Sequence, residues 1–343
     1  MRTLVIERPG HVLLQERPIP VAQTGEVLVR PLAVGICGSD LDLLRGTRPV
    51  EYGRYPIVPG HEWAAEIVTS SIEALPPGTP VAVEGHHYCR MCARCRQGAT
   101  NLCVQYDEFG FTHDGGLAEL VVVRADLLHP FQRELPAEYA ALTEPAACAL
   151  HGVESAEPRP GETIVIIGPG TLGLLGVSLF AQYHPRRLIV VGRRASNQET
   201  ALALGATHFV TGSPWEVQQA VQELTAGTGA DIVYESAGQL PALQLAFQLA
   251  RRGGRIILEG VAGDAATLSL PADIFLLKDL TVHGIFAYTS THFEQALRLL
   301  EMGTITFAPL VTHRFSLAHY TDGIALLENK QERAIKVIIF PQQ

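Results

Sequence analysis

The chain has 343 residues, of which 47% are hydrophobic and 18% charged, and its formal net charge is -9. This composition supplies enough apolar surface for buried cores and excludes a disordered chain, while the length favours two domains over one. The acidic balance gives no basic surplus for binding nucleic acid or anionic lipid, so we expect neither as a partner.

The first part of the chain, residues 1–150, carries short extended runs separated by Pro and Gly. The predicted strands are Glu26 to Pro31, Ile67 to Ser70, Val81 to Glu84 and Glu119 to Arg124. This pattern predicts a mostly β domain. The opening residues, MRTLVIERPG, interrupt their apolar stretch with charges, so we expect no secretory signal there.

Four cysteines crowd into one loop of this domain and follow the pattern Cys-x2-Cys-x2-Cys-x7-Cys: Cys89, Cys92, Cys95 and Cys103. Four thiolates fill a tetrahedral zinc site and leave no open position, which predicts a structural zinc; an iron-sulfur cluster is the rival. Such a grouping suits a metal in the reducing cytoplasm better than a disulfide framework. Cys148 stands apart and is interpreted as a buried small hydrophobic residue.

From about Thr163 apolar strands alternate with helical segments, and the predicted strands are TIVIIG, RLIVVG, HFVTG, DIVYES and RIILEG. A helix is expected to run to about Tyr183 and another over Ser196 to Leu204. This alternation predicts a doubly wound parallel sheet over residues 151–286. The long apolar stretch 163–181 contains Pro169 and several glycines, so it is interpreted as a buried strand, turn and helix, not a membrane span.

A glycine-rich turn follows the first of these strands, with Gly168, Gly170 and Gly173 in Gly-x-Gly-x-x-Gly spacing. The glycines permit a tight turn and close approach of the backbone to a pyrophosphate, and the following helix begins with unpaired N-H groups. Thr171 and Leu172 complete the predicted cofactor turn. A purely structural strand-to-helix turn is the alternative.

The second strand ends in Gly192-Arg193-Arg194, where an NAD enzyme would usually carry an acid. No carboxylate repels a 2'-phosphate there, and the guanidiniums of Arg193 and Arg194 are able to bind one. The sequence therefore favours NADP over NAD. Two solvated surface arginines are the alternative.

The last segments, residues 287–343, leave this alternation. A helix over Thr291 to Met302 and another running to about Asn329 precede a final strand, AIKVIIF. We expect this tail to pack on the first domain.

A cysteine, a histidine and carboxylates recur in separate short segments: Cys37 in GICGSD, His61 and Glu62 in VPGHEW, and Glu144 in LTEPAACALH. Together they make an open mixed-ligand set, of the kind that leaves a zinc position free for substrate or water. Each segment alone is more often a packing or surface feature.

The ordered set of Cys37-Gly38-Ser39-Asp40, Gly60-His61-Glu62, the cysteine loop, Glu144-Pro145 and the glycine turn resembles the zinc-containing medium-chain alcohol dehydrogenases over essentially the whole chain. It is most similar to the polyol branch, with sorbitol and threonine dehydrogenases. The resemblance implies a GroES-like catalytic domain (1–150, completed by 287–343), a Rossmann domain (151–286) and a homodimer or homotetramer. It also implies that Cys37, His61 and one or both of Glu62 and Glu144 hold a catalytic zinc.

In that family a hydroxyl matching Ser39 binds the substrate oxygen and passes its proton on, while Glu62 is a candidate for the same catalytic chemistry. Many relatives carry histidine five residues after the cysteine ligand, whereas this chain has Asp42, so the next step of the relay is open. Asp42 is interpreted as a relay through water, a contact to the cofactor ribose, or a solvated acid.

We therefore predict a zinc-dependent oxidoreductase with two zinc sites, which transfers a hydride between a secondary alcohol of a polyol, sugar or cyclitol and NADP. Three alternatives stay open: a catalytically silent NADP-binding protein, an NAD-dependent dehydrogenase of a simple alcohol or amino-alcohol, and a zinc-free reductase of the same superfamily.

Overall fold

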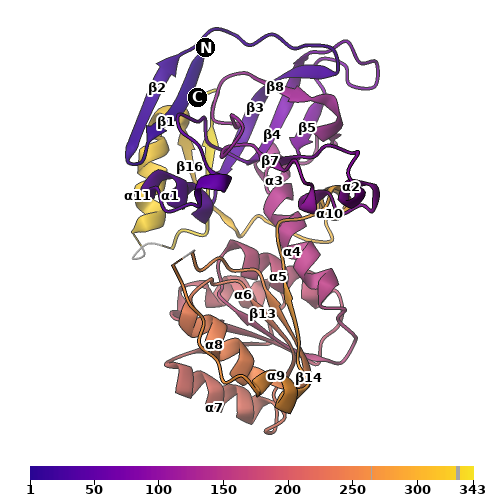
Figure 1. Ribbon diagram of the computed structural model, residues 1–343, viewed down its shortest axis with the longest axis vertical. Helices are drawn as coiled ribbons and strands as arrows, with labels where there is room; N and C mark the ends of the chain where they lie inside the picture. Colours follow the sequence, from indigo (N-terminus) through magenta and orange to yellow (C-terminus); the bar gives the residue numbers. More distant parts are fainter. Residues whose placement is uncertain (264, 330–332) are drawn as a thin grey trace. The chain divides into compact units, whose positions relative to one another are not determined.

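The computed structural model describes residues 1–263, 265–329 and 333–343. The chain forms two compact units, the first made of residues 1–147 and 289–343 and the second of residues 148–288 (Figure 1). The predicted boundaries at 150 and 287 lie within three residues of these divisions. The C-terminal tail thus belongs to the first unit.

The first unit is built on a seven-stranded sheet in which β8 pairs with β3 outside the main path. Its strands are, in spatial order, β16 (Val311–Ser316), β17 (Lys336–Phe340), β3 (Glu26–Ile36), β4 (Glu62–Thr69), β5 (Pro80–Val83) and β9 (Leu128–Pro130), with β8 at Val121–Arg124. Two small pairs are β1 (Arg2–Arg8) with β2 (His11–Glu16) and β6 (His86–His87) with β7 (Asp107–Glu108).

Among the described residues, five α-helices lie wholly within this unit: α1 (Gly38–Arg45), α2 (Ala93–Arg96), α3 (Ala137–Ala140), α10 (Ser290–Glu301) and α11 (Tyr320–Glu328). α4 (Thr143–Ser155) begins in the first unit and ends in the second. In Figure 1 the yellow C-terminal segments β16 and α11 lie beside the indigo N-terminal strands, so both ends of the chain build one body.

The second unit is a six-stranded sheet in which every neighbouring pair is parallel. In spatial order the strands are β12 (His208–Thr211), β11 (Arg187–Gly192), β10 (Thr163–Ile167), β13 (Ala230–Glu235), β14 (Ala250–Leu258) and β15 (Thr281–Gly284). In chain order this arrangement is 3-2-1-4-5-6, the Rossmann topology, and confirms the predicted doubly wound sheet.

The helices of this unit are α5 (Thr171–Ala181), α6 (Gln198–Ala203), α7 (Pro214–Leu224), α8 (Leu240–Leu249) and α9 (Ile274–Lys278). All five residues of β10 are buried, as expected for a central parallel strand covered on both faces. The crossover helices follow from the same requirement, because parallel strands need a connection that returns to the start of the sheet.

Some elements differ from the predictions. The predicted helix from Ser196 is split into a 3-10 turn and the short α6, and β15 was not predicted, since its residues are mostly exposed and show no apolar alternation. His86 and His87 form the short strand β6, for which the sequence shows no strand pattern. Cys148 is only partly buried, so its interpretation as a core residue is corrected as well.

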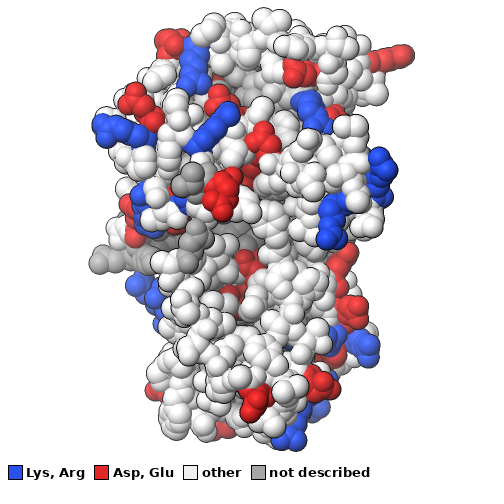
Figure 2. Space-filling view, viewed as in Figure 1, with Lys and Arg blue, Asp and Glu red and all other residues white. Residues whose placement is uncertain are grey.

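On the face drawn in Figure 2, basic and acidic side chains are interspersed among wide uncharged areas. No helix within the described ranges has the length and apolar character needed to cross a bilayer.

Candidate catalytic metal centre and cofactor site

The first unit brings Cys37, His61 and Glu62 together, with one potential ligand atom of each within 4.8 Å of the others. Cys37 follows the end of β3 and caps the N-terminus of α1, while Glu62 is the first residue of β4. Because β3 and β4 are antiparallel neighbours, the end of one strand lies beside the start of the other. Local strand pairing therefore joins ligands that are far apart in sequence.

Asp40 lies against both Cys37 and His61. Its Oδ2 accepts a hydrogen bond from the backbone N-H of Cys37 at 2.8 Å, and its Oδ1 lies 3.7 Å from Nδ1 of His61. Oδ1 of Asp40 and Nδ1 of His61 are both buried, and neither has a hydrogen-bond partner in the described part of the chain. Burial lowers the pKa of His61, but Asp40 and Cys37 outweigh it and raise that pKa well above its usual value. Such a negative field fits a metal cation.

Glu62 is held by a buried lysine from the C-terminal strand. The Nζ of Lys336 lies 2.8 Å from Oε1 and 2.6 Å from Oε2 of Glu62, and it also donates to the backbone oxygen of Ile36. Burial lowers the pKa of Lys336, but Glu62 and Cys37 raise it above its usual value. Both oxygens of Glu62 are therefore already engaged by an ammonium ion.

Glu144, in the first turn of α4, is 8% exposed and lies outside the closest group of ligands. Burial, with repulsion from Glu62 and Glu108, raises its pKa to about 8, against the attraction of His61. A carboxyl group that is costly to ionise without a cation nearby is well suited to bind one.

The predicted proton carriers lie on α1. Ser39 is half-buried in its first turn, and Asp42 follows three residues later. The Oδ1 of Asp42 accepts a hydrogen bond from Oγ1 of Thr47 at 3.4 Å, which is long for such a contact.

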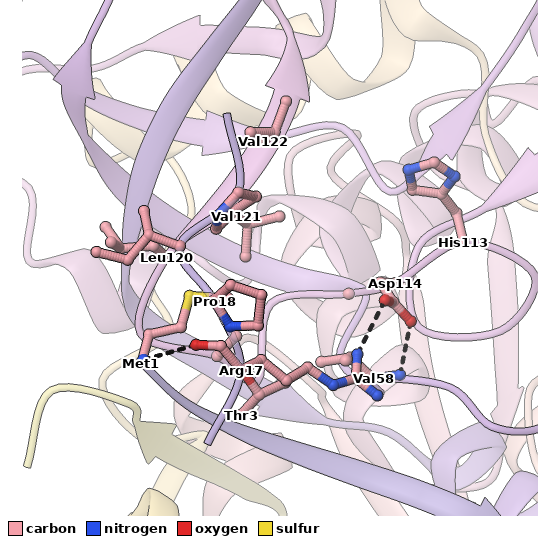
Figure 3. Close-up of a pocket in the computed structure, with 14 residues that line it drawn as sticks. Met1, Thr3, Arg17, Pro18, Val58, His113, Asp114, Leu120, Val121 and Val122 are labelled. Atoms are coloured by element: carbon pink, nitrogen blue, oxygen red, sulfur yellow. Dashed lines mark hydrogen bonds and ion pairs between the residues drawn. The ribbon is translucent and has the colours of Figure 1, made fainter. Parts of the chain in front are cut away.

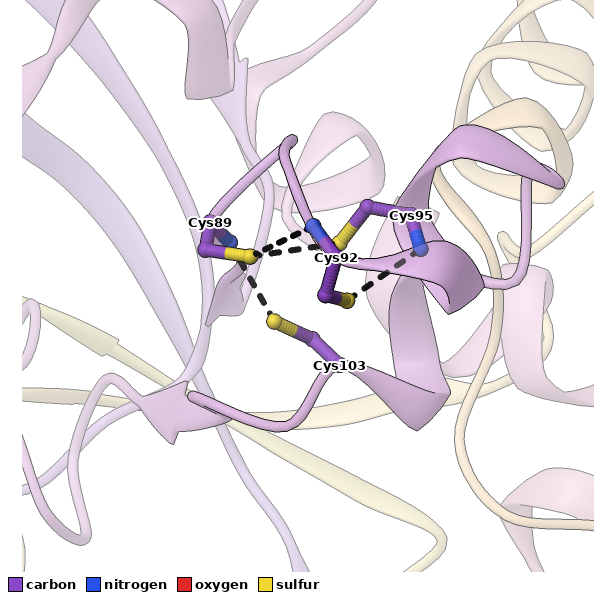
Figure 4. Close-up of side chains that lie close together, drawn as sticks. All are labelled: Cys89, Cys92, Cys95 and Cys103. Carbon is purple, nitrogen blue, oxygen red and sulfur yellow. Dashed lines mark hydrogen bonds between the residues drawn. The ribbon is translucent and has the colours of Figure 1, made fainter.

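The four loop cysteines converge as predicted, with one sulfur of each within 4.8 Å of the others (Figure 4). Backbone N-H groups point at their sulfurs, as from Cys89 to Sγ of Cys103 at 3.2 Å and from Cys92 to Sγ of Cys89 at 3.3 Å. Hydrogen bonds from the backbone of Cys95 and Val104 lower the pKa of Cys92 to about 6. Four sulfurs around one centre, with donors that favour thiolates, fit a closed zinc site.

The glycine turn of the second unit lies between β10 and α5, with Thr171 and Leu172 in the first turn of the helix. Gly168 has a φ of 101°, and a Cβ on Gly173 would lie 1.9 Å from the backbone oxygen of Gly168. Neither position tolerates a side chain, so the turn brings the N-terminus of α5 to the carboxyl end of the sheet.

The end of β11 is equally restricted. A Cβ on Gly192 would lie 2.9 Å from ring atoms of both Phe209 and Pro169, whereas the next residues, Arg193 and Arg194, are exposed. An acid does not fit at Gly192 without displacement of its neighbours. Arg193 and Arg194 are therefore the first exposed residues after β11.

Sequence reasoning missed Lys336 and assigned no role to Asp40. A lone lysine inside the apolar strand AIKVIIF was a usable signal, because a buried charge needs a partner. The spacing of Cys37 and Asp40 also matches a capping box, which the structure forms.

A cavity of about 350 Å³ in the first unit is separate from these groups (Figure 3). It is lined by Met1, Pro18, Leu120 and their neighbours, and Asp114 at its edge binds Arg17 and the backbone N-H of Val58. None of the candidate metal ligands lines it.

Comparison with known proteins matches two family domains to the chain. Residues 23–133 match the alcohol dehydrogenase GroES-like domain, and residues 171–302 match the zinc-binding dehydrogenase domain. Sorbitol dehydrogenase of Bacillus subtilis (strain 168) is 30% identical over 349 residues, covering 100% of this chain and 98% of that protein.

Solved structures agree. A zinc-binding dehydrogenase from Sinorhizobium meliloti 1021 bound to NADP has a TM-score of 0.91 and 28% identity, with 99% of each chain covered. An alcohol dehydrogenase from Escherichia coli CFT073 complexed with NADH has a TM-score of 0.92 and 28% identity, with the same coverage. The relatives of this chain are named dehydrogenases, and this chain is an NAD(P)-dependent alcohol or polyol dehydrogenase. The chain belongs to the zinc-containing medium-chain alcohol dehydrogenases, in the branch of the polyol, sorbitol and threonine dehydrogenases.

Proposed function

We propose that this enzyme oxidises a secondary hydroxyl of a polyol, sugar or cyclitol with NADP, at a zinc ion held by Cys37 and His61 with a carboxylate. The observation that carries the proposal is the cluster of half-buried Cys37 with buried His61 and Glu62, to which the repulsion between Glu62 and Glu144 adds a second nearby carboxyl group. One thiolate, one imidazole and one carboxylate leave a fourth position for substrate.

We assign the third ligand to Glu144 in the resting protein, since both oxygens of Glu62 are engaged by Lys336. Glu62 is then available to replace Glu144 when Lys336 releases it. When bound, zinc supplies Lewis acidity that lowers the pKa of a hydroxyl, and the nicotinamide accepts the hydride.

The chain's own residues manage the proton. The Oγ of Ser39 accepts the proton of the substrate hydroxyl as the carbon gives up its hydride, and passes its own proton onward. Asp42 lies three residues along α1, and residues at that spacing share a helix face, so its carboxylate is the next acceptor through water. Asp40 keeps the His61 ring in place without entering the proton path.

The proposal assigns NADP to Arg193 and Arg194. Their exposure beside the glycine turn, and the lack of room for an acid at Gly192, support a site for a 2'-phosphate. The four-cysteine loop is assigned a second, structural zinc. Free cysteines grouped in this way support a reducing compartment such as the cytoplasm.

We also propose a homodimer or homotetramer. β15 is the edge of its sheet, and Leu276 and Leu277 just before it are 80% and 70% exposed. Exposed sheet edges with apolar neighbours favour pairing with a second copy. Light scattering of the purified protein gives the oligomer mass, and a monomer would contradict this assignment.

The function is tested by initial rates of the zinc-loaded protein across sorbitol, other polyols, aldoses, cyclitols and simple alcohols, each with NAD and NADP. We expect turnover of secondary hydroxyls with NADP preferred. Activity confined to simple primary alcohols would contradict the substrate class, and equal or better use of NAD would contradict the cofactor. Binding of NADPH with no turnover of any substrate would favour a silent binding protein.

A further inference from the structure

A second charge pair, which is half-buried, lies in the first unit, one aromatic ring away from His61. Nη2 of Arg48 is 2.8 Å from Oε2 of Glu108, and each side chain is only 16% exposed. Arg48 follows α1 by a short loop, and Glu108 ends β7. Partial removal of the two charges from water costs free energy, and their pairing offsets part of that cost.

The pair is attached to His61 through one aromatic ring. The guanidinium carbon of Arg48 lies 3.5 Å from the centroid of the Phe111 ring, and that ring lies 4.7 Å from the centroid of the His61 ring. Phe111 thus lies between the charge pair and His61, a ligand of the proposed zinc. The charge pair of Arg48 and Glu108 is called the wall.

Backbone packing holds Glu108 against the same ligand. The backbone oxygen of Glu108 accepts from the N-H of Phe111, and Gly110 between them has a φ of 80°. A Cβ on Gly110 would lie 2.7 Å from the backbone nitrogen of Gly60, the residue before His61. Burial raises the pKa of Glu108, and the nearby side chains of Arg48 and His61 oppose that rise.

This wall offers hydrogen bonds but little net charge. Nη2 of Arg48 is used by Glu108 and its Nε by the backbone oxygen of Tyr52, whereas Nη1 donates to no group within the described residues. The carboxylate of Glu108 accepts Nη2 of Arg48 at Oε2 and also accepts a hydrogen bond from the Tyr106 side chain, and its two oxygens have room for further donors. A free donor beside an acceptor matches a hydroxyl, which donates one hydrogen bond and accepts others.

We propose that Arg48 and Glu108 form the substrate-recognition wall of this enzyme, binding a further hydroxyl of a neutral polyol whose reacting hydroxyl lies at the metal centre. This rests on the proposed function. It makes the pair a specificity determinant for neutral polyols over phosphorylated ones, because Glu108 repels an anion and cancels the charge of Arg48. It also explains why a monohydric alcohol would gain nothing from the pair.

The first experiment replaces Arg48. Arg48→Lys and Arg48→Met should lower the ratio of kcat/KM for sorbitol to kcat/KM for butan-2-ol by about tenfold or more, the loss expected for a charge-assisted hydrogen bond. The matched control is Arg45→Ala at the end of α1, three residues before Arg48, since Arg45 forms an exposed ion pair with Glu328. That control should leave the ratio unchanged. Equal losses for both substrates in the Arg48 variants would overturn the proposal.

The second experiment changes the charge of the wall without shortening it. Glu108→Gln leaves the guanidinium uncompensated, so kcat/KM for sorbitol 6-phosphate should rise at least about tenfold relative to sorbitol. A wild-type preference for the phosphorylated substrate, or no shift of this ratio in the variant, would contradict a neutral-polyol site.

Equilibrium binding separates this inference from the proposed reaction. Calorimetric titration of zinc-loaded wild-type protein with sorbitol should show binding that the Arg48 variants weaken about tenfold or more. Binding with this pattern, but without turnover, supports the recognition wall while contradicting the proposed reaction. Turnover of secondary alcohols with unaltered sorbitol affinity in the variants would overturn the wall alone. Zinc content and melting temperature of each variant establish that it is folded and loaded.

Discussion

The ammonium nitrogen of Lys336 lies 2.6 Å from Oε2 of Glu62, and both side chains are at least 98% buried. The two residues are 274 positions apart in the chain and meet because β17 pairs with β3, which pairs with β4. The C-terminal strand therefore does more than complete the sheet. It supplies the ammonium group that pairs with one carboxylate of the candidate metal centre.

Removing that cation should destabilise the protein. Lys336→Met leaves Glu62 buried and unpaired, and breaking a buried ion pair from one side costs about 3–5 kcal/mol. We expect a clear fall in the thermal unfolding midpoint of the metal-free variant, partly recovered in Lys336→Met/Glu62→Leu. Arg45→Ala, which breaks an exposed pair, serves as the control and should cost at most about 1 kcal/mol. A shift no larger than this control would show that the buried pair carries little stability.

The two glutamates should differ in their effect on zinc. Because Lys336 already engages Glu62, Glu144→Gln should weaken the catalytic zinc more than Glu62→Gln, by about ten- to a hundredfold, the range found when partners around a metal are altered. Competition with a chromophoric chelator measures the affinity of each variant. The assignment of Glu144 as resting ligand fails if Glu62→Gln has the larger effect.

The cysteine loop should hold its own metal. Cys92→Ser removes one of four sulfur ligands, so we expect loss of one zinc per chain and a lower melting temperature, with the catalytic zinc retained. Elemental analysis of the purified variant measures the metal content. Cys148→Ser is the matched control and should keep both ions. An unchanged zinc content in Cys92→Ser would contradict a structural site.

The arginines after β11 should select the cofactor. The double variant Arg193→Ala/Arg194→Ala should raise KM for NADP about tenfold or more. KM for NAD should stay nearly unchanged, because NADP carries a 2'-phosphate and NAD does not. Steady-state kinetics with both cofactors measure this, and Arg252→Ala provides an exposed arginine of the same unit as a control. Parallel changes for both cofactors would show that these side chains do not read the phosphate.

Glu235, at the end of β13, should make stability depend on pH. Burial raises its pKa to about 6, although hydrogen bonds from Ala237 and Gly238 oppose the rise. The folded state then keeps a proton that the unfolded state, with a lower pKa, has lost. Stability is therefore full below the unfolded pKa and falls as pH rises to about 6, by roughly 1–2 kcal/mol.

Unfolding of wild-type protein and Glu235→Gln across pH 4–7 measures this contribution. The variant stays neutral at every pH and keeps an oxygen for the backbone donors, so the fall assigned to Glu235 should disappear. Identical profiles of stability against pH for wild-type protein and Glu235→Gln would show that Glu235 does not cause the fall in stability.

The sequence was sufficient to predict those sites whose residues lie close together in the chain. The glycine turn and the four-cysteine loop each lie within a short segment, so spacing alone predicted the geometry that the structure shows. The parallel sheet also followed from alternating apolar strands. β15 was not predicted from the sequence, because this exposed edge strand shows no apolar alternation.

The long-range contacts of the site could not be predicted. Lys336 meets Glu62 through strand pairing, and Arg48 packs on Phe111, which lies against His61; no local pattern encodes either contact. A single lysine in an apolar strand signals a buried partner, but not which acid it is. The choice between Glu62 and Glu144 depended on this contact, so the sequence left it open.

The most direct test of the account is turnover of a neutral polyol before and after metal depletion. Protein stripped of its weakly held zinc by a chelator, with the cysteine loop still loaded, should bind NADPH but not oxidise sorbitol or its best polyol substrate. One added equivalent of zinc should restore the rate. Full activity in the depleted protein would contradict a zinc-dependent reaction at Cys37, His61 and Glu144.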